Sequence, residues 1–223
     1  MTKRMTEFVR AGFLTLLLCS NVPEGFAQKG MDQININGQF VLAARAGRIE
    51  RVVALLEEGA KVNSRDRNGD SPLNMAASKG NLPLLNVLMK AGADVNLANL
   101  SGVTPLMGAT FSGNAEIMRK LLAAGANIAP LDRVKKNAAT YAAGNGCSEC
   151  LAELIRAGTP VNAALENDLT LLMWAAAYGH ESAVRLLQAE GADPKLKDNR
   201  GKTAADMARE GKHQNVVGLL AQQ

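Results

Sequence analysis

Residues 68–73 read Asn-Gly-Asp-Ser-Pro-Leu, and residues 101–106, which lie 33 positions further along the chain, read Ser-Gly-Val-Thr-Pro-Leu. The same interval separates Gly80 from Gly113. A fixed period of this length indicates an array of structural repeats, in which each unit buries its apolar face against its neighbours.

Each copy predicts two helices joined by a turn. Ser71 is a preferred N-cap residue, and Pro72 suits the first helical position because an amide hydrogen there would have no partner. Gly80 ends this helix, since glycine adopts the left-handed conformation of a helix end without steric cost. A second helix follows, with Leu84 and Leu88 spaced four residues apart on one face.

This order of helix, turn, helix and hairpin tip resembles the ankyrin repeat. The resemblance implies an all-α repeat solenoid of about six repeats. The first copy has no Thr-Pro pair and the last is rich in glutamine, as expected for terminal repeats that face water. The predicted repeats cover residues 35–67, 68–100, 101–133, 134–166, 167–199 and 200–223.

The fourth copy departs most from the pattern. Lys135 replaces the glycine of the hairpin tip, and Asn137-Ala138 replaces Thr-Pro. We therefore expect a weaker and reshaped helix start in this repeat.

Residues 1–27 have the features of a secretory signal. Lys3, Arg4 and Arg10 precede the apolar run 11–19, and small residues near Ala27 suit a cleavage site. Cleavage there would leave residues 28–34 as a short extension and place the protein in the periplasm or outside a bacterial cell. The apolar run is shorter than the roughly 20 residues that cross a bilayer, so no membrane span is expected after cleavage.

Lipid attachment at Cys19 is a second interpretation of the same segment. Leu18 occupies the position where the bacterial lipoprotein motif has a small residue, which favours simple cleavage. Loss of residues 1–27, with three basic and two acidic side chains, changes the formal net charge only from +4 to +3. This mildly basic chain lacks the strong charge bias typical of nucleic-acid binding.

The sequence indicates no catalytic, metal-binding or cofactor-binding residues. Its only histidines, His180 and His213, have no carboxylates nearby at metal-ligand spacing. His180 follows Gly179 at a position where ankyrin repeats commonly have histidine, which implies a structural hydrogen bond. No phosphate-binding loop or nucleophile elbow occurs, so we expect a non-catalytic protein without a cofactor.

Cys147 and Cys150 are the only cysteines beyond the predicted signal, and they lie at the start of a second helix. Such a pair suits a disulfide in an exported protein, and it also suits a reactive dithiol. Cys150 takes a position that is apolar in neighbouring repeats, which equally suits plain core packing. All three interpretations remain open at this point.

In ankyrin proteins, partners contact the hairpin tips and the ends of the first helices. Carried onto this chain, those positions include large apolar residues beside arginine and lysine, which dominate binding energy at interfaces. Tyr141 and Trp174 are expected to pack between repeats instead. The predicted partner-binding residues are Leu100, Val103, Phe111, Arg133, Lys136, Leu169, Tyr178 and Arg200.

The resemblance implies a monomeric scaffold that binds an unidentified protein partner. One alternative is a periplasmic thiol-redox or oxidative-stress protein that uses Cys147 and Cys150. Another is an ankyrin effector directed into a host cell, for which the fate of residues 1–27 is the discriminating observation.

Overall fold

The computed structural model describes the backbone of residues 24–221 and the side chains of residues 35–221. The predicted signal up to residue 23, with Cys19, therefore lies outside the described residues. Twelve α-helices and one 3-10 helix make up the described part, which contains no strand. This arrangement confirms the predicted all-α repeat solenoid.

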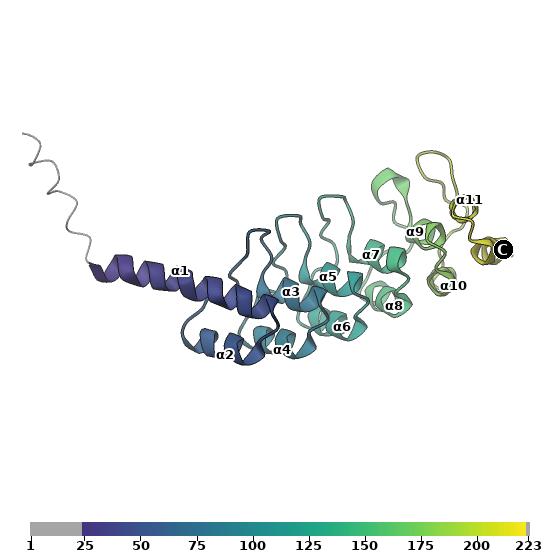
Figure 1. Ribbon diagram of the computed structural model, residues 1–223. Helices are drawn as coiled ribbons and strands as arrows, with labels where there is room; N and C mark the ends of the chain where they lie inside the picture. Colours follow the sequence, from purple (N-terminus) through teal and green to yellow (C-terminus); the bar gives the residue numbers. More distant parts are fainter. Residues whose placement is uncertain (1–23, 222–223) are drawn as a thin grey trace, which may run out of the picture.

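The helices alternate between first and second helices of successive repeats (Figure 1). Their bounds are α1 Glu24–Arg45, α2 Ile49–Glu57, α3 Pro72–Ser78, α4 Leu82–Lys90, α5 Pro105–Phe111, α6 Ala115–Ala123, α7 Ala138–Asn145, α8 Ser148–Arg156, η1 Glu166–Asp168, α9 Leu171–Ala177, α10 Glu181–Ala189, α11 Ala204–Glu210 and α12 Gln214–Leu220.

Helix α1 is longer than the first helices of the other repeats. It runs without interruption from Glu24 to Arg45, so the predicted extension 28–34 is continuous with the first repeat. Its N-terminal half projects beyond the array in Figure 1. The predicted cleavage point near Ala27 falls inside this helix.

The first helices of repeats 2 to 6 begin where the sequence predicts, because a polar side chain caps each of them. Ser71 Oγ accepts a hydrogen bond from the Asn74 amide at 3.2 Å, and Thr104 Oγ1 accepts one from the Met107 amide at 3.3 Å. A cap of this kind stabilises a helix by about 1 kcal/mol.

The fourth repeat does not have the reshaped start that we expected. Asn137 Oδ1 caps α7 by accepting from the Thr140 amide at 2.9 Å, since asparagine caps as well as serine or threonine. The tip also keeps its shape: Lys135 adopts φ 59°, close to the left-handed conformation of Gly69 and Gly102 at the same position of earlier repeats.

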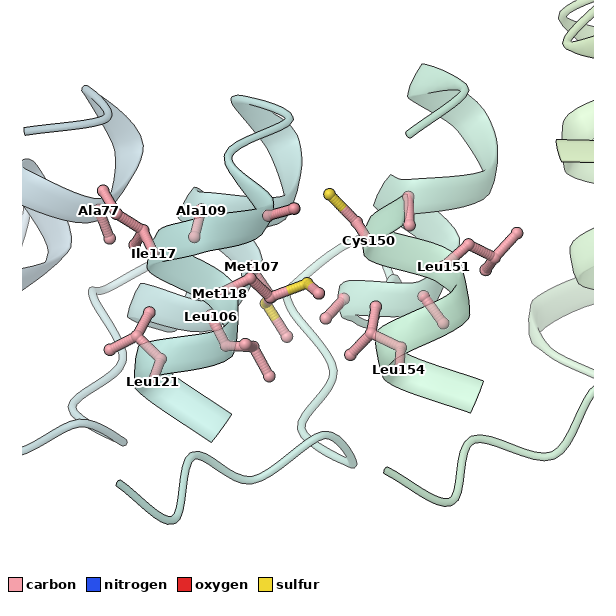
Figure 2. Packing of buried hydrophobic residues seen from close by; sticks show 14 of the residues in the cluster. Ala77, Leu106, Met107, Ala109, Ile117, Met118, Leu121, Cys150, Leu151 and Leu154 are labelled. Atoms are coloured by element: carbon pink, nitrogen blue, oxygen red, sulfur yellow. The ribbon is translucent and has the colours of Figure 1, made fainter. Parts of the chain in front are cut away.

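Stacking of equivalent residues forms one continuous core. First helices pack on first helices, as α3 does on α5, and second helices pack on second helices, as α6 does on α8. One leucine of each second helix from α2 to α10 is fully buried at the repeat interval, and Figure 2 shows two of these leucines on neighbouring helices. This leucine row comprises Leu55, Leu88, Leu121, Leu154 and Leu187.

A hairpin loop leads from each second helix to the next first helix. We number these loops 1 to 5, and Figure 1 shows them projecting on one side of the helices. Loops 1 to 5 comprise residues 58–71, 91–104, 124–137, 157–170 and 190–203.

Candidate functional site

Three of the predicted apolar contact residues are exposed. Leu100, Phe111 and Tyr178 have exposed fractions of 56%, 63% and 55%. Arg133 and Arg200 are also exposed, and Lys136 is half-buried. The structure therefore supplies large apolar side chains and cations on the loop side of the array.

Val103 and Leu169 are not exposed in the way the sequence predicts. Both are half-buried and pack against the core. Each directly precedes the residue that caps a first helix, Thr104 or Thr170, where the chain turns from the tip towards the core. The prediction of exposure was wrong because a position in the repeat does not reveal the direction of the side chain.

Two exposed residues at the ends of the predicted surface already have partners within the chain. Leu100 covers the tip of loop 1, where a Cβ added at Gly69 would lie 2.8 Å from Leu100 Cγ. Arg200 pairs with Asp198 at 2.8 Å. The centre of the predicted surface, in loop 3 and helices α5 to α9, is therefore more available for a partner than its two ends.

Four aromatic side chains form a row across this centre, which we call the aromatic row: Phe111, Tyr141, Trp174 and Tyr178. Phe111 meets Tyr141 edge to face with ring centroids 5.8 Å apart, and Trp174 stacks on Tyr178 at 6.1 Å. Every aromatic side chain that the structure describes, apart from Phe40, belongs to this row.

Lys136 lies between the two halves of the aromatic row. Its Nζ atom is 4.5 Å from the centroid of Trp174 and 5.9 Å from that of Tyr141. Attraction between an ammonium and an aromatic face contributes about 0.5–1 kcal/mol at exposed sites and more when water is excluded. The predicted inter-repeat packing of Tyr141 and Trp174 agrees with their half-buried positions.

Asp132 ties the tip of loop 3 to helix α7, a role that the sequence analysis missed. Its Oδ1 atom accepts from the amides of Val134 and Lys136, each at 2.9 Å, and its Oδ2 atom accepts from the Tyr141 hydroxyl. Burial, reinforced by this hydrogen bond and by the carboxylate charge, raises the pKa of Tyr141 to about 12. The sequence does contain a signal for this role, because Asp66, Asn99, Asp132 and Asp198 recur at one position of the repeat.

Backbone hydrogen bonds join most neighbouring tips. The Leu100 amide donates to the Asn68 carbonyl at 3.0 Å, between loops 1 and 2. The Arg133 amide donates to the Ser101 carbonyl at 2.9 Å, between loops 2 and 3. The Asn199 amide donates to the Asn167 carbonyl at 3.1 Å, between loops 4 and 5.

A second row of bonds joins the same loops nearer to the second helices. Asn96 Oδ1 accepts from the Asn127 amide at 2.8 Å, and Asn162 Oδ1 accepts from the Asp193 amide at 2.8 Å. Asn63 does the same for Asp94 at 3.0 Å. These asparagines recur at the repeat interval.

Loops 3 and 4 lack both rows. Across residues 124–137 and 157–170, all of which are described, no hydrogen bond joins one loop to the other. Ala129 stands where loops 1, 2 and 4 have the accepting asparagine, and Pro160 has no amide hydrogen to donate. The other three junctions therefore keep the bond from an asparagine side chain to an amide of the next loop. The junction between loops 3 and 4 lacks both the acceptor and the donor of this bond.

The tip of loop 4 differs for a related reason. Leu165 occupies the position of Asp132, so it has no side-chain oxygen to accept from the tip amides. The chain instead forms η1, in which Asn167 and Asp168 both adopt φ 60°. This altered tip no longer offers its backbone to loop 3.

A pocket of about 180 Å³ lies between loops 3 and 4, and we call it the slot. Its lining combines apolar side chains with charged residues of both loops. The slot is lined by Val134, Lys135, Lys136, Thr140, Leu165, Glu166, Asn167, Leu169 and Trp174. Lys136 and Trp174 thus belong both to the slot and to the surface of the aromatic row.

A disulfide joins Cys147 and Cys150 at the start of α8. Cys147 is the N-cap residue, and its sulfur lies 3.2 Å from the Cys150 amide nitrogen, where Asn81 and Asn114 cap the equivalent helices. Cys150 is fully buried at the position that Ile117 takes on the neighbouring helix (Figure 2).

Both histidines have structural hydrogen bonds. The Nε2 atom of His180 donates to the Gly144 carbonyl at 2.8 Å, and that of His213 donates to the Ala177 carbonyl at 3.1 Å. Each bond links one repeat to the preceding one. This is the role that the sequence implied for His180.

The described part of the chain offers neither a metal site nor a membrane-spanning helix. Among the side chains of residues 35–221 there is no group of three or more His, Cys, Asp or Glu placed to hold a metal ion. Within residues 24–221, no helix combines the length and the apolar character needed to cross a bilayer.

Comparison with known proteins agrees with the repeat architecture. The family model described as "Ankyrin repeats (3 copies)" matches residues 40–132 and again residues 135–223. A segment of 92 residues, 40% of this chain, is 35% identical to the E3 ubiquitin-protein ligase hecd-1 of Caenorhabditis elegans. The match spans only 3% of that much longer protein, so the similarity concerns the repeats alone. This chain belongs to the ankyrin-repeat family.

Proposed function

We propose that this protein is an exported, non-catalytic scaffold that binds a protein partner through the aromatic row and the adjoining tips. Ankyrin repeats are typically protein-binding modules, which supports the general assignment. The observation that carries the specific surface is the aromatic row, in which Phe111 and Tyr178 are 63% and 55% exposed.

An exposed row of aromatic side chains beside cations has the composition of an interface centre. The second helices present a different surface, where Arg119 pairs with Glu149 and Glu153, and Arg156 also pairs with Glu153. Exposed ion pairs of this kind contribute little free energy and favour solubility. The two faces therefore suit different roles.

Site-specific photo-crosslinking in native cells tests this surface. A photoreactive amino acid at Phe111 or Tyr178 should form a covalent adduct with one partner protein, identified by mass spectrometry. The matched control carries the same group at Arg185, an exposed residue of α10. Adducts at Arg185 but at neither aromatic position would contradict the proposal.

Export is the second part of the proposal, and the signal-like residues 1–27 support it. The intact mass and N-terminal sequence of protein from fractionated cells test it directly. A chain that begins at or near Gln28 in the periplasm or culture medium is the expected result. A chain that retains Met1 in the cytosol would contradict export.

A thiol-redox role is a second candidate, which the Cys147–Cys150 disulfide favours. Cys150 is fully buried, so an incoming thiolate would attack the sulfur of the half-buried Cys147. This step would form a mixed disulfide with Cys147, break the Cys147–Cys150 bond and release Cys150 as a thiolate. Thiol titration with and without reductant should then reveal one reversible dithiol. A Cys147→Ser variant with unchanged function in cells would exclude this role.

A further inference from the structure

We infer that the slot between loops 3 and 4 receives an extended segment of the protein partner, with an apolar side chain in the pocket and a neighbouring carboxylate beside Lys136. This inference rests on the proposed function and specifies what the partner presents. It depends on three properties of the slot: its backbone groups, its apolar lining and its charge.

The two sides of the slot offer unpaired backbone groups. By position in the repeat, the Glu166 amide should donate to the Val134 carbonyl, as the Arg133 amide donates to the Ser101 carbonyl. Neither the Glu166 amide nor the Val134 carbonyl has a hydrogen-bond partner among the described residues. A peptide backbone supplies both an acceptor and a donor, so an extended segment can satisfy the two groups.

The interior of the slot suits one apolar side chain. Leu165, Leu169 and the Trp174 ring form an apolar wall, and the volume is about 180 Å³. For scale, an engineered apolar cavity of about 150 Å³ in another protein binds benzene. Leu165 favours the slot in two ways. Its side chain cannot accept the hydrogen bonds that Asp or Asn accepts from the tip amides of other loops, and it lines the slot itself.

The charge of loop 3 favours a carboxylate next to that side chain. Lys136 contacts aromatic rings but forms no ion pair within the described residues, and the same holds for Arg133 and Lys135. Asp132, the acidic residue of this tip, is buried and already accepts hydrogen bonds from the Tyr141 hydroxyl and the tip amides.

The opposite wall limits how acidic the segment can be. Glu166 lines the slot, and Asp168 lies on the same tip. A run of acidic residues would meet these carboxylates and be repelled. The charges therefore favour a single carboxylate on the loop 3 side rather than an acidic tract.

Closing the slot tests the inference. The variant Ala129→Asn/Pro160→Asp/Leu165→Asn/Asp168→Gly gives the junction the residue types of the others, so both rows of bonds can form. The probe is a phage-displayed library of random linear peptides, selected on the full wild-type chain. Binding of synthetic copies is followed by fluorescence of Trp174, the only tryptophan of the chain.

We expect selected peptides to pair an apolar residue with an adjacent Asp or Glu. The closed-slot variant and Lys136→Met should each bind them about tenfold more weakly or worse, as expected when a charged or backbone hydrogen bond is lost. Methylation of one peptide amide nitrogen should have a similar effect, and this arm does not depend on how a variant folds. Circular dichroism checks that the variants keep their helices.

Two results would overturn the inference. One is a selection whose peptides lack the apolar and acidic pair, and the other is equal affinity for the wild-type and closed-slot proteins. Phe111→Ala and Tyr178→Ala, tested with the crosslinked partner, separate this failure from failure of the proposed function. If these two variants weaken partner binding while the closed-slot variant does not, the aromatic row remains the proposed binding surface and the inference about the slot is wrong.

Discussion

The junction between loops 2 and 3 and the junction between loops 3 and 4 have the same repeat interval but different hydrogen bonding. The first has the Asn96 side-chain bonds and a backbone bond between the tips. The second has no bond between its loops and contains the slot instead. The helices nevertheless stack at both, since α5 packs on α7 as α7 packs on α9.

This difference shows that helix stacking and loop pairing are encoded separately. Stacking depends on buried alanines and leucines that recur in every copy, whereas pairing depends on a few polar residues per loop. A junction can therefore lose its loop bonds while the core continues through it. Such a place is locally less stable and better suited to binding.

Truncation of the leucine row should have the largest effect and should not distinguish the junctions. Leu121→Ala and Leu154→Ala each remove a fully buried side chain, so each should lower the free energy of unfolding by about 2–5 kcal/mol. Urea denaturation followed by circular dichroism measures both. A cost below about 1 kcal/mol for Leu154 alone would show that the core, too, weakens near the slot.

Asn96→Ala should remove the side-chain row of bonds between loops 2 and 3, while the backbone bond between their tips remains. The change removes the bond from the Asn127 amide and the bond to the Gly125 carbonyl, at an expected cost of about 1–2 kcal/mol. Hydrogen exchange of the Asn127 amide should accelerate. Conversely, Ala129→Asn/Pro160→Asp should allow the side-chain bond between loops 3 and 4 and so raise the free energy of unfolding. An unchanged free energy of unfolding would mean that these loops lie too far apart to pair.

Lys135→Gly should stabilise the tip of loop 3 by about 1 kcal/mol. Lys135 adopts φ 59°, a conformation that carries a steric cost of this size for residues with a Cβ atom. The matched control is Gly102→Lys in loop 2, where an added Cβ would lie 3.0 Å from the Asp132 Cα atom. This control should destabilise the protein. In thermal melts, Lys135→Gly should therefore raise the melting temperature and Gly102→Lys should lower it.

Asp132→Asn should change a pKa more than it changes the fold. Asn99 holds the tip of loop 2 through the same amide contacts, so the tip of loop 3 should survive the substitution. Loss of the carboxylate should lower the pKa of Tyr141 from about 12 towards its ordinary value, as measured by tyrosinate absorbance. An unchanged Tyr141 pKa would assign the whole shift to burial.

The sign of the linked stability follows from the raised pKa. In the unfolded chain Tyr141 loses its proton near pH 10, whereas in the folded protein it keeps the proton to about pH 12. The contribution to stability is therefore complete below about pH 10 and is lost as the pH rises to about 12. In Asp132→Asn this loss should be smaller.

The sequence by itself determined the fold, because the signals involved are local and repeated. The cap residues, the glycines after the first helices and the leucine row act within one repeat or between adjacent repeats. Even the fourth repeat, with Asn137 in place of threonine, begins its helix at the same position. The irregular residues Ala129, Pro160 and Leu165 are visible in the sequence, although their shared effect is not.

Only the tertiary structure decided which side chains meet. Lys136 and Trp174 are 38 positions apart, and their contact depends on how two repeats stack. The burial of Val103 and Leu169 and the opening of the slot depend on the same packing. Repeat positions predict backbone conformation because that is set locally, whereas exposure and contacts are set by neighbouring repeats, which a single repeat pattern does not describe.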